Sequence, residues 1–182
     1  MNKDKVRKHL LKIRNSIKNK EYLSKLINYQ VIQHIQKHFT NPYIASFISL
    51  KNEVNTSIIN NHFKNIYLPV IHPFIPHALW FAKDSKKYYL NKYNIKEPIY
   101  STKDILTAWE LDIILVPIIG FNNKKYRMGM GGGFYDYTLK FKKSRKYPLT
   151  IGVAFDEQEN NDIMIEKHDI KLDVIVTPTR VL

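Results

Sequence analysis

The sequence contains no cysteine among its 182 residues. This absence excludes disulfides, thiolate zinc sites, cysteine nucleophiles and iron–sulfur clusters together, and it makes a reducing cytosol the default compartment. No apolar run approaches the roughly 20 residues that a membrane-spanning helix needs. The N-terminal segment is charged and has no apolar signal-peptide region. We therefore expect a cytoplasmic protein with no membrane partner.

Arginine is also scarce, although the formal net charge is +13, with 29 lysines and arginines against 16 acidic residues. Arginine occurs only at positions 7, 14, 127, 145 and 180. Base readout and bidentate phosphate binding favour arginine over lysine. The joint excess of lysine, asparagine, isoleucine and tyrosine is more typical of compositional drift, so we expect no nucleic acid as partner. A basic nucleic-acid-binding module, built on the N-terminal helix, is retained as the alternative.

Helix-like and strand-like segments alternate along the chain. Apolar residues recur at spacings of three and four over residues 4–38, which predicts one or two amphipathic helices with a mostly solvated basic face. Another helix is expected over residues 53–63, and a short one after residues 101–104, whereas residues 96–98 are typical of an irregular turn. Buried strands are predicted at residues 43–50, 66–71, 79–82, 111–116, 150–155 and 174–176.

This alternation predicts an α/β fold over residues 1–182 as a single domain. We expect a Rossmann-like three-layer sandwich, in which a mostly parallel open sheet carries helices on both faces. A chain of this size, with 44% hydrophobic residues, can bury a substantial core.

A glycine-rich loop is the most informative segment. Four glycines, at positions 129, 131, 132 and 133, follow a predicted strand and precede a helical pattern. In α/β proteins this order binds phosphate, because backbone N–H groups and a helix N-terminus face the anion. Arg127 can add a charge-assisted contact. The loop matches neither the dinucleotide fingerprint nor the P-loop, and close packing of a helix on the sheet is the structural alternative.

Acidic residues near this loop have two interpretations. Asp136 directly follows the loop, so it can hold Mg²⁺ together with phosphate oxygens, or it can act as a charge at a helix N-terminus. Asp169 can add a second carboxylate to the metal or lie in a solvated loop. His72 and His77 lack a third ligand at metal spacing, so we interpret them as ordinary surface histidines.

The chain resembles the 5-formyltetrahydrofolate cyclo-ligase family, also called 5,10-methenyltetrahydrofolate synthetases. The resemblance spans nearly the whole chain and rests on RMGMGGGFYD at 127–136, with LVPIIGF, FISLKNEVNT, LPVIHPF, KEP and IGVAF…HDI…VIVTP in the same order. Several versions of the signature carry lysine where Gly132 stands. The chain therefore departs from those versions at this position and lacks the lysine side chain there.

The resemblance implies an enzyme, EC 6.3.3.2. It would use ATP and Mg²⁺ to cyclise 5-formyltetrahydrofolate to 5,10-methenyltetrahydrofolate, with release of ADP and phosphate. The formyl oxygen would be phosphorylated and N10 would then attack, so no enzyme nucleophile is required, which agrees with the absence of cysteine and of a catalytic triad. We expect a monomer. A sugar-phosphate or CoA-type enzyme on a similar sheet is a further alternative, because a fold does not determine function.

The resemblance also implies roles for individual residues. Arg127 and Glu53 would be catalytic, with Glu53 anchoring the pterin edge. ATP would be bound by Lys3, Arg7, Arg127, Met128, Gly129, Met130, Gly131, Gly132, Gly133, Phe134 and Tyr135. The folate substrate would be bound by Ile48, Glu53, Met130, Gly131, Gly132, Gly133 and Phe134. The metal would be held by Asp136 and Asp169.

Two of these roles are plausible from the residues alone. Lys3 and Arg7 are four residues apart, so they share a helix face and can address one triphosphate. Glu53 follows a predicted strand, and α/β sheets bind ligands at the carboxyl ends of their strands. As an alternative, Glu53 is the N-terminal charge of the next helix.

Overall fold

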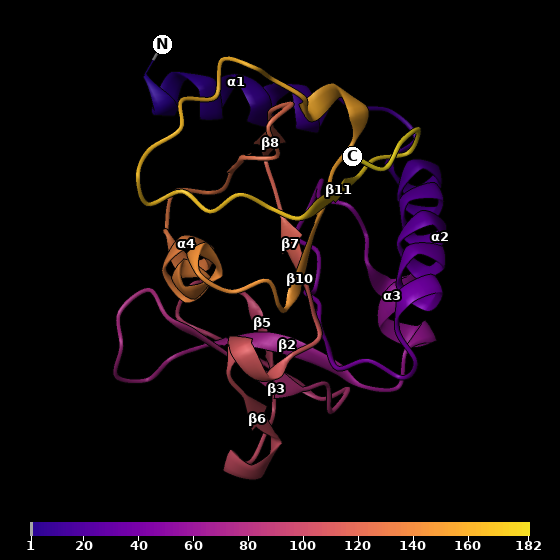
Figure 1. The fold of residues 1–182 in the computed structure, drawn as a ribbon, viewed down its shortest axis with the longest axis vertical. Coiled ribbons are helices and arrows are strands. Elements are labelled where there is room, and N and C mark those ends of the chain that lie inside the picture. Colours follow the sequence, from indigo (N-terminus) through magenta and orange to yellow (C-terminus); the bar gives the residue numbers. More distant parts are fainter. Residues whose placement is uncertain (1) are drawn as a thin grey trace.

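The helices follow the predicted order in a computed structural model that describes residues 2–182 (Figure 1). The N-terminal segment forms two helices, α1 (Lys3–Ser16) and α2 (Lys20–His38). The later α-helices are short, α3 (Ser57–His62) and α4 (Phe134–Thr138). The 3-10 helices are η1 (Thr102–Asp104), η2 (Ala108–Glu110), η3 (Lys140–Lys143) and η4 (Asp156–Gln158). Among the described residues, none of the helices is both long and apolar enough to span a membrane.

A seven-stranded sheet forms the centre of the molecule, in the order β11-β10-β7-β1-β2-β3-β6. Its strands are β1 (Ile44–Ala45), β2 (Ile66–Ile71), β3 (Leu79–Lys83), β6 (Ile105–Leu106), β7 (Ile113–Pro117), β10 (Leu149–Val153) and β11 (Val174–Val176). The strands from β11 to β2 pair in parallel, whereas β3 and β6 are antiparallel at one edge. The predicted mostly parallel sheet is confirmed.

Both faces of the sheet are covered because side chains alternate along each strand. In β7, Ile113 and Leu115 pack with α2 and α3, while Ile114 and Val116 pack on the opposite face. That second face is covered by residues of η2, by Leu139 after α4 and by the segment that precedes β11. Figure 1 shows α2 and α3 on one side of the strands and α4 on the other. The expected three-layer α/β architecture is therefore confirmed.

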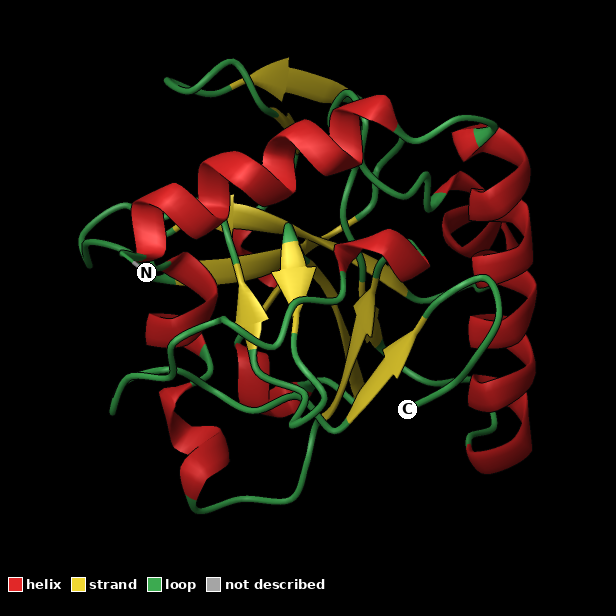
Figure 2. Ribbon diagram, turned by 90° about the horizontal axis from the view of Figure 1, so that it is seen from above, coloured by secondary structure: helices red, strands yellow, loops and turns green. Residues whose placement is uncertain are grey.

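Helix α1 belongs to neither layer, because it lies across one end of the sheet (Figures 1 and 2). Its apolar residues Val6 and Leu10 are fully buried against Ile119 and Met128. Ile119 follows the carboxyl end of β7. The helix therefore covers the end of the sheet at which parallel strands place their ligands.

Two predicted elements are shorter than expected. The apolar run 43–50 was expected to be one strand, but β1 ends at Ala45. Phe47 then packs into the core outside the sheet, because burial alone does not require strand pairing. The helix expected over 53–63 begins only at Ser57. The side chain of Thr56 donates to the carbonyl oxygen of Phe47 at 2.6 Å and holds the preceding residues in an irregular turn.

The interpretation of residues 96–98 as an irregular turn is wrong. These residues form β5 (Lys96–Pro98), which pairs with β4 (Tyr88–Leu90) in a separate antiparallel hairpin. The buried carboxylate of Glu97 holds this hairpin, since it accepts from Ile71 N–H at 3.1 Å, from the amide of Asn91 at 2.8 Å and from the hydroxyl of Tyr89. A second small ribbon joins β8 (Gly120–Phe121) to β9 (Arg127–Met128).

Gly120 allows α1 to approach the sheet, which leads to a stability prediction. A Cβ at position 120 would meet the end of the Leu10 side chain and lie 3.1 Å from the carbonyl oxygen of Gln158. We expect Gly120→Ala to lower the free energy of unfolding by about 1–3 kcal/mol, as overpacking does in a buried core. Urea denaturation measures this change. The matched control is Gly129→Ala, whose added Cβ has no atom within 4 Å, and an equal loss in both variants would contradict the packing explanation.

Candidate functional site

The order of strands places the candidate site at a switch point of the sheet. β1 lies between β2 and β7, so the chain builds the sheet first to one side of β1 and later to the other. Ligands bind in the crevice outside the carboxyl ends of strands at such a point. Here the segment after β1 carries Ile48 and Glu53, and the segment after β7 carries the glycine loop. Helix α1 covers both.

One face of α1 presents three cations to this end of the sheet. Lys3, Arg7 and Arg14 lie at spacings of four and seven, so they share the buried side of the helix. Their side chains are only 22%, 21% and 6% exposed. The expectation of a solvated basic face is therefore wrong for Arg14, which sequence reasoning missed. Its spacing of seven from Arg7 was the signal that could have placed it on the same face.

The first of these cations pairs with the acidic loop before β11. Lys3 Nζ lies 2.9 Å from Asp169 Oδ2 and 3.2 Å from Glu166 Oε2. Asp169 is nearly buried and also accepts the backbone N–H of Glu166 at 2.8 Å. Asp169 is therefore ion-paired and not a free solvated loop residue, and its role as a metal ligand stays a prediction.

The second cation contacts the glycine loop. Arg7 Nε donates to the carbonyl oxygen of Gly129 at 3.0 Å, and its guanidinium also pairs with Asp4. A Cβ on Gly131 would lie 3.4 Å from Arg7 Cζ, and Gly131 has a φ of +97°. Glycine is therefore required at position 131 both for its backbone conformation and for the close approach of the arginine.

The backbone of the glycine loop offers unused donors. Within residues 2–182, the N–H groups of residues 129–133 donate no hydrogen bond. The following helix α4 has only five residues, so its dipole is smaller than the sequence pattern suggested, because a helix dipole sums over aligned peptides. The free amide groups and the neighbouring arginines therefore provide the attraction for an anion.

Arg127 is buried beneath this loop. Its Nη2 lies 3.0 Å from Asp136 Oδ1, and its Nη1 donates to the carbonyl oxygen of Ile170 at 3.2 Å. The backbone N–H of Ile170 donates in turn to Asp136 Oδ1 at 3.2 Å. Asp136 lies in the first turn of α4. Besides being a charge at a helix N-terminus, it connects Arg127 to the backbone of Ile170.

These contacts bring the two predicted metal ligands close together. Asp169 immediately precedes Ile170, whose N–H contacts Asp136. Within residues 2–182, no group of three or more histidine, aspartate or glutamate side chains is arranged to hold a metal ion. Two carboxylates suit Mg²⁺ when phosphate oxygens and water complete its shell. The donor set therefore fits a metal that arrives with a nucleotide.

Glu53 contacts α1 at Arg14, seven residues beyond the arginine that contacts the glycine loop. Its Oε2 accepts the N–H of Leu50 at 2.8 Å, and its Oε1 lies 3.4 Å from Arg14 Nη1. Because α3 begins four residues later at Ser57, Glu53 is not the N-terminal charge of that helix. Ile48 is half-buried and packs against the core beneath α2.

Tyr135 is influenced by two charged groups, the carboxylate of Glu53 and the guanidinium of Arg127. Burial raises the pKa of its hydroxyl, the negative charge of Glu53 raises this pKa further, and the positive charge of Arg127 lowers it. The hydroxyl is therefore a proton donor at neutral pH, although it has no hydrogen-bond partner among the described residues. Phe134, the preceding residue, packs against His77 and Tyr93 with ring centroids 5.6 and 6.3 Å apart.

His77 has a contact that its interpretation as an ordinary surface histidine did not include. Its Nδ1 lies 2.7 Å from the carbonyl oxygen of Gly132. This contact connects the loop after β2 to the glycine loop. Gly132 therefore has a neighbour at its carbonyl oxygen, and a Cβ added at this position would lie 3.0 Å from the ring of Phe134. No sequence spacing links these two residues, which are 55 positions apart.

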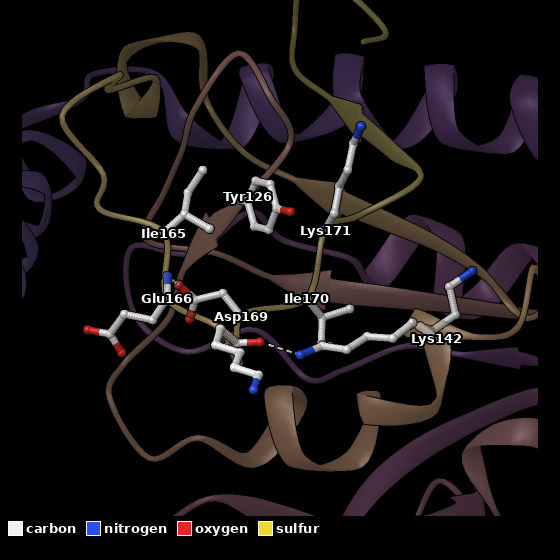
Figure 3. A pocket seen from close by; sticks show the side chains of 9 residues that line it. Tyr126, Lys142, Ile165, Glu166, Asp169, Ile170 and Lys171 are labelled. Carbon is white, nitrogen blue, oxygen red and sulfur yellow. Dashed lines mark hydrogen bonds between the residues drawn. The ribbon is translucent and has the colours of Figure 1, made fainter.

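A surface hollow of about 510 Å³ adjoins the acidic side of the site (Figure 3). In Figure 3, Ile165 and Glu166 lie on one side of the view and Lys142 and Lys171 on the other. Lys143, Lys167 and Tyr126 also line the hollow, together with Asp169. Neither Glu53 nor Ile48 does. The hollow therefore adjoins the site at Asp169 and Ile170, and not at Glu53.

Comparisons with known proteins identify the family of this chain. The model of the 5-formyltetrahydrofolate cyclo-ligase family matches residues 1–178. A 5-formyltetrahydrofolate cyclo-ligase of Haemophilus influenzae is 32% identical over 168 residues, which cover 85% of this chain and 89% of the relative. The Escherichia coli K12 protein of the same name is 34% identical over 144 residues, covering 76% and 79%.

A solved structure has the same fold. The 5,10-methenyltetrahydrofolate synthetase of Aquifex aeolicus is 25% identical, with a TM-score of 0.79 over 100% of this chain and 92% of that chain. A family model that covers nearly the whole chain and relatives of this identity establish the family. The chain is an enzyme and belongs to the 5-formyltetrahydrofolate cyclo-ligase family.

Proposed function

We propose that this enzyme uses ATP and Mg²⁺ to convert 5-formyltetrahydrofolate into 5,10-methenyltetrahydrofolate. One observation carries the proposal: a single face of α1 connects an anion-binding loop to a buried carboxylate across the switch point of the sheet. Arg7 contacts the glycine loop at 3.0 Å and Arg14 contacts Glu53 at 3.4 Å. A phosphate donor and a ring with hydrogen-bond donors can therefore meet beneath one helix.

The triphosphate would lie on the glycine loop. Lys3, Arg7 and Arg127 supply positive charge around it, and the N–H groups of residues 129–133 supply unused donors. The loop segment Met128 to Tyr135 would line this side, and the hollow beside Asp169 would receive the nucleoside. Asp136 and Asp169 would hold Mg²⁺, which neutralises phosphate charge when bound.

The folate would lie on the opposite side of the loop. Glu53 would accept hydrogen bonds from the pterin edge, with Ile48 beside it, and Met130 to Phe134 would contact the substrate from above. The formyl oxygen would attack the γ-phosphorus and ADP would leave. N10 would then attack the formyl carbon and lose its proton. The bond between this carbon and the phosphorylated oxygen would break, and phosphate would leave. This chemistry needs positioning and charge neutralisation.

The contacts of three cations of α1 weaken the nucleic-acid alternative. Lys3, Arg7 and Arg14 all contact other parts of the chain. A polyanion on this helix would therefore be left with the exposed lysines Lys5, Lys8 and Lys12.

The proposed function is tested with the purified chain, ATP, Mg²⁺ and 5-formyltetrahydrofolate. We expect the near-ultraviolet absorbance of the methenyl product to rise with equimolar ADP and phosphate. Omission of Mg²⁺ should abolish the reaction, and sugar phosphates or CoA in place of the folate should give no ADP. Absence of methenyl product under all conditions would refute the proposal.

A further inference from the structure

The buried ion pair between Arg14 and Glu53 is the starting point. The two side chains are 6% and 9% exposed, and Nη1 lies 3.4 Å from Oε1. This distance is long for a charge-assisted bond. Two charges that are nearly removed from water need additional hydrogen bonds to be stable. The contact between Arg14 and Glu53 alone does not provide these additional hydrogen bonds.

Arg14 retains a buried donor that nothing in the chain satisfies. Its Nε has no hydrogen-bond partner within residues 2–182, and the hydroxyl of Tyr135, near Glu53, has none either. Buried polar groups without a partner are rare in folded proteins, because they lose their hydrogen bonds to water without replacement. The unpaired Nε of Arg14 belongs to a side chain that contacts a buried carboxylate, and this indicates that a ligand supplies the missing acceptor.

The groups at this position have a defined pattern. Glu53 offers two oxygens, each with lone pairs beyond those used by Leu50 N–H and Arg14. Arg14 offers Nε–H beside them. A carboxylate next to a donor complements a ring edge that presents two donors followed by an acceptor. In a pterin, the 2-amino group, the N3–H and the 4-oxo oxygen have this order.

We propose that Arg14 determines specificity together with Glu53, so that the pair selects a 4-oxo pterin over a 2,4-diaminopteridine. Glu53 accepts from the 2-amino group and N3–H, while Arg14 orients the carboxylate and donates Nε–H to the 4-oxo oxygen. A 4-amino group presents a donor to a cationic donor and leaves Nε–H unpaired. The inference rests on the proposed function and adds a residue and a basis for selectivity to it.

Folic acid and aminopterin test this inference, because position 4 carries an oxygen in folic acid and an amino group in aminopterin, and N3 carries a hydrogen only in folic acid. Dissociation constants are measured by titration calorimetry with the intact chain. We expect the wild type to bind folic acid about tenfold or more tightly than aminopterin, since a site built to bond an oxygen rejects the analogue without it. In Arg14→Met the ratio should fall by about threefold or more, because the donor to the 4-oxo oxygen is gone while Glu53 still distinguishes the two ligands at N3.

Two further variants separate selectivity from a structural role. Lys12→Met, on the exposed side of α1, should keep the wild-type ratio. Arg14→Lys keeps a positive charge beside Glu53 but lacks Nε–H, and we expect its ratio to fall by about threefold or more while circular dichroism shows a folded chain. This variant decides the question if Arg14→Met does not fold.

Several results would overturn the inference. These are a wild-type ratio near one, binding of neither analogue, or an unchanged ratio in folded Arg14→Lys. Formation of methenyl product by the wild type is measured in parallel. Product with no selectivity refutes the role of Arg14 alone, whereas absence of product refutes the proposed function.

Discussion

Arg127→Ala is expected to lower kcat/KM for ATP by about 10³-fold, the effect of losing an arginine that neutralises phosphate charge during transfer. The guanidinium lies beneath the glycine loop, 3% exposed, and it joins Asp136 to the carbonyl oxygen of Ile170. Its loss removes positive charge from the proposed triphosphate side. It also removes the contacts that hold Asp136 and the segment of Ile170 together. The dissociation constant of 5-formyltetrahydrofolate, measured without ATP, should change far less.

The same variant should also be less stable. Removing one partner of a buried ion pair typically costs 3–5 kcal/mol, and we expect about 3 kcal/mol because Asp136 keeps some contact with solvent. Steady-state kinetics and urea denaturation measure the two effects. Arg145→Ala, at an exposed arginine, is the matched control and should change neither. Equal weakening of ATP and folate would show that Arg127 does not belong to the nucleotide side.

The strands of the sheet could largely be predicted from the sequence. The run at 111–116 is apolar except at Asp112, and a strand that is covered on both faces accommodates such a run. The predictions at 66–71 and 174–176 match β2 and β11. Residues 43–50 were misassigned because Phe47 is buried without pairing. Apolar periodicity reports burial, and it reports pairing only where neighbouring strands are available.

The site could be predicted only where its residues lie close together in the sequence. The glycine loop and Arg127 form one continuous motif. Arg14 escaped notice because a cation on an amphipathic helix is normally solvated, and its partner Glu53 lies 39 positions away. The contact of His77 with Gly132 depends on two loops that only the folded sheet brings together. The unused N–H groups of the glycine loop are a property of backbone geometry, which the sequence does not encode locally.

Glu53→Gln should weaken the binding of 5-formyltetrahydrofolate and not that of ATP, which is the opposite of the effect expected for Arg127→Ala. The carboxylate is 9% exposed and held by Leu50 N–H and Arg14. Glutamine has nearly the same shape but presents an amide N–H₂ where the proposed pterin edge needs an acceptor. A lost hydrogen bond to a charged group that leaves buried donors unpaired costs about 2–3 kcal/mol. We therefore expect the dissociation constant of 5-formyltetrahydrofolate to rise about 30- to 150-fold.

The KM for ATP should change by no more than about twofold in Glu53→Gln, because Glu53 contacts Arg14, about three helical turns along α1 from the Lys3 that pairs with Asp169. Glu157→Gln, at an exposed glutamate, is the matched control and should leave both constants unchanged. Fluorescence titration and steady-state kinetics separate the two ligands. If Glu53→Gln and Arg127→Ala weakened the same ligand, α1 would cover one pocket instead of two, and the cations along its face would all serve the triphosphate.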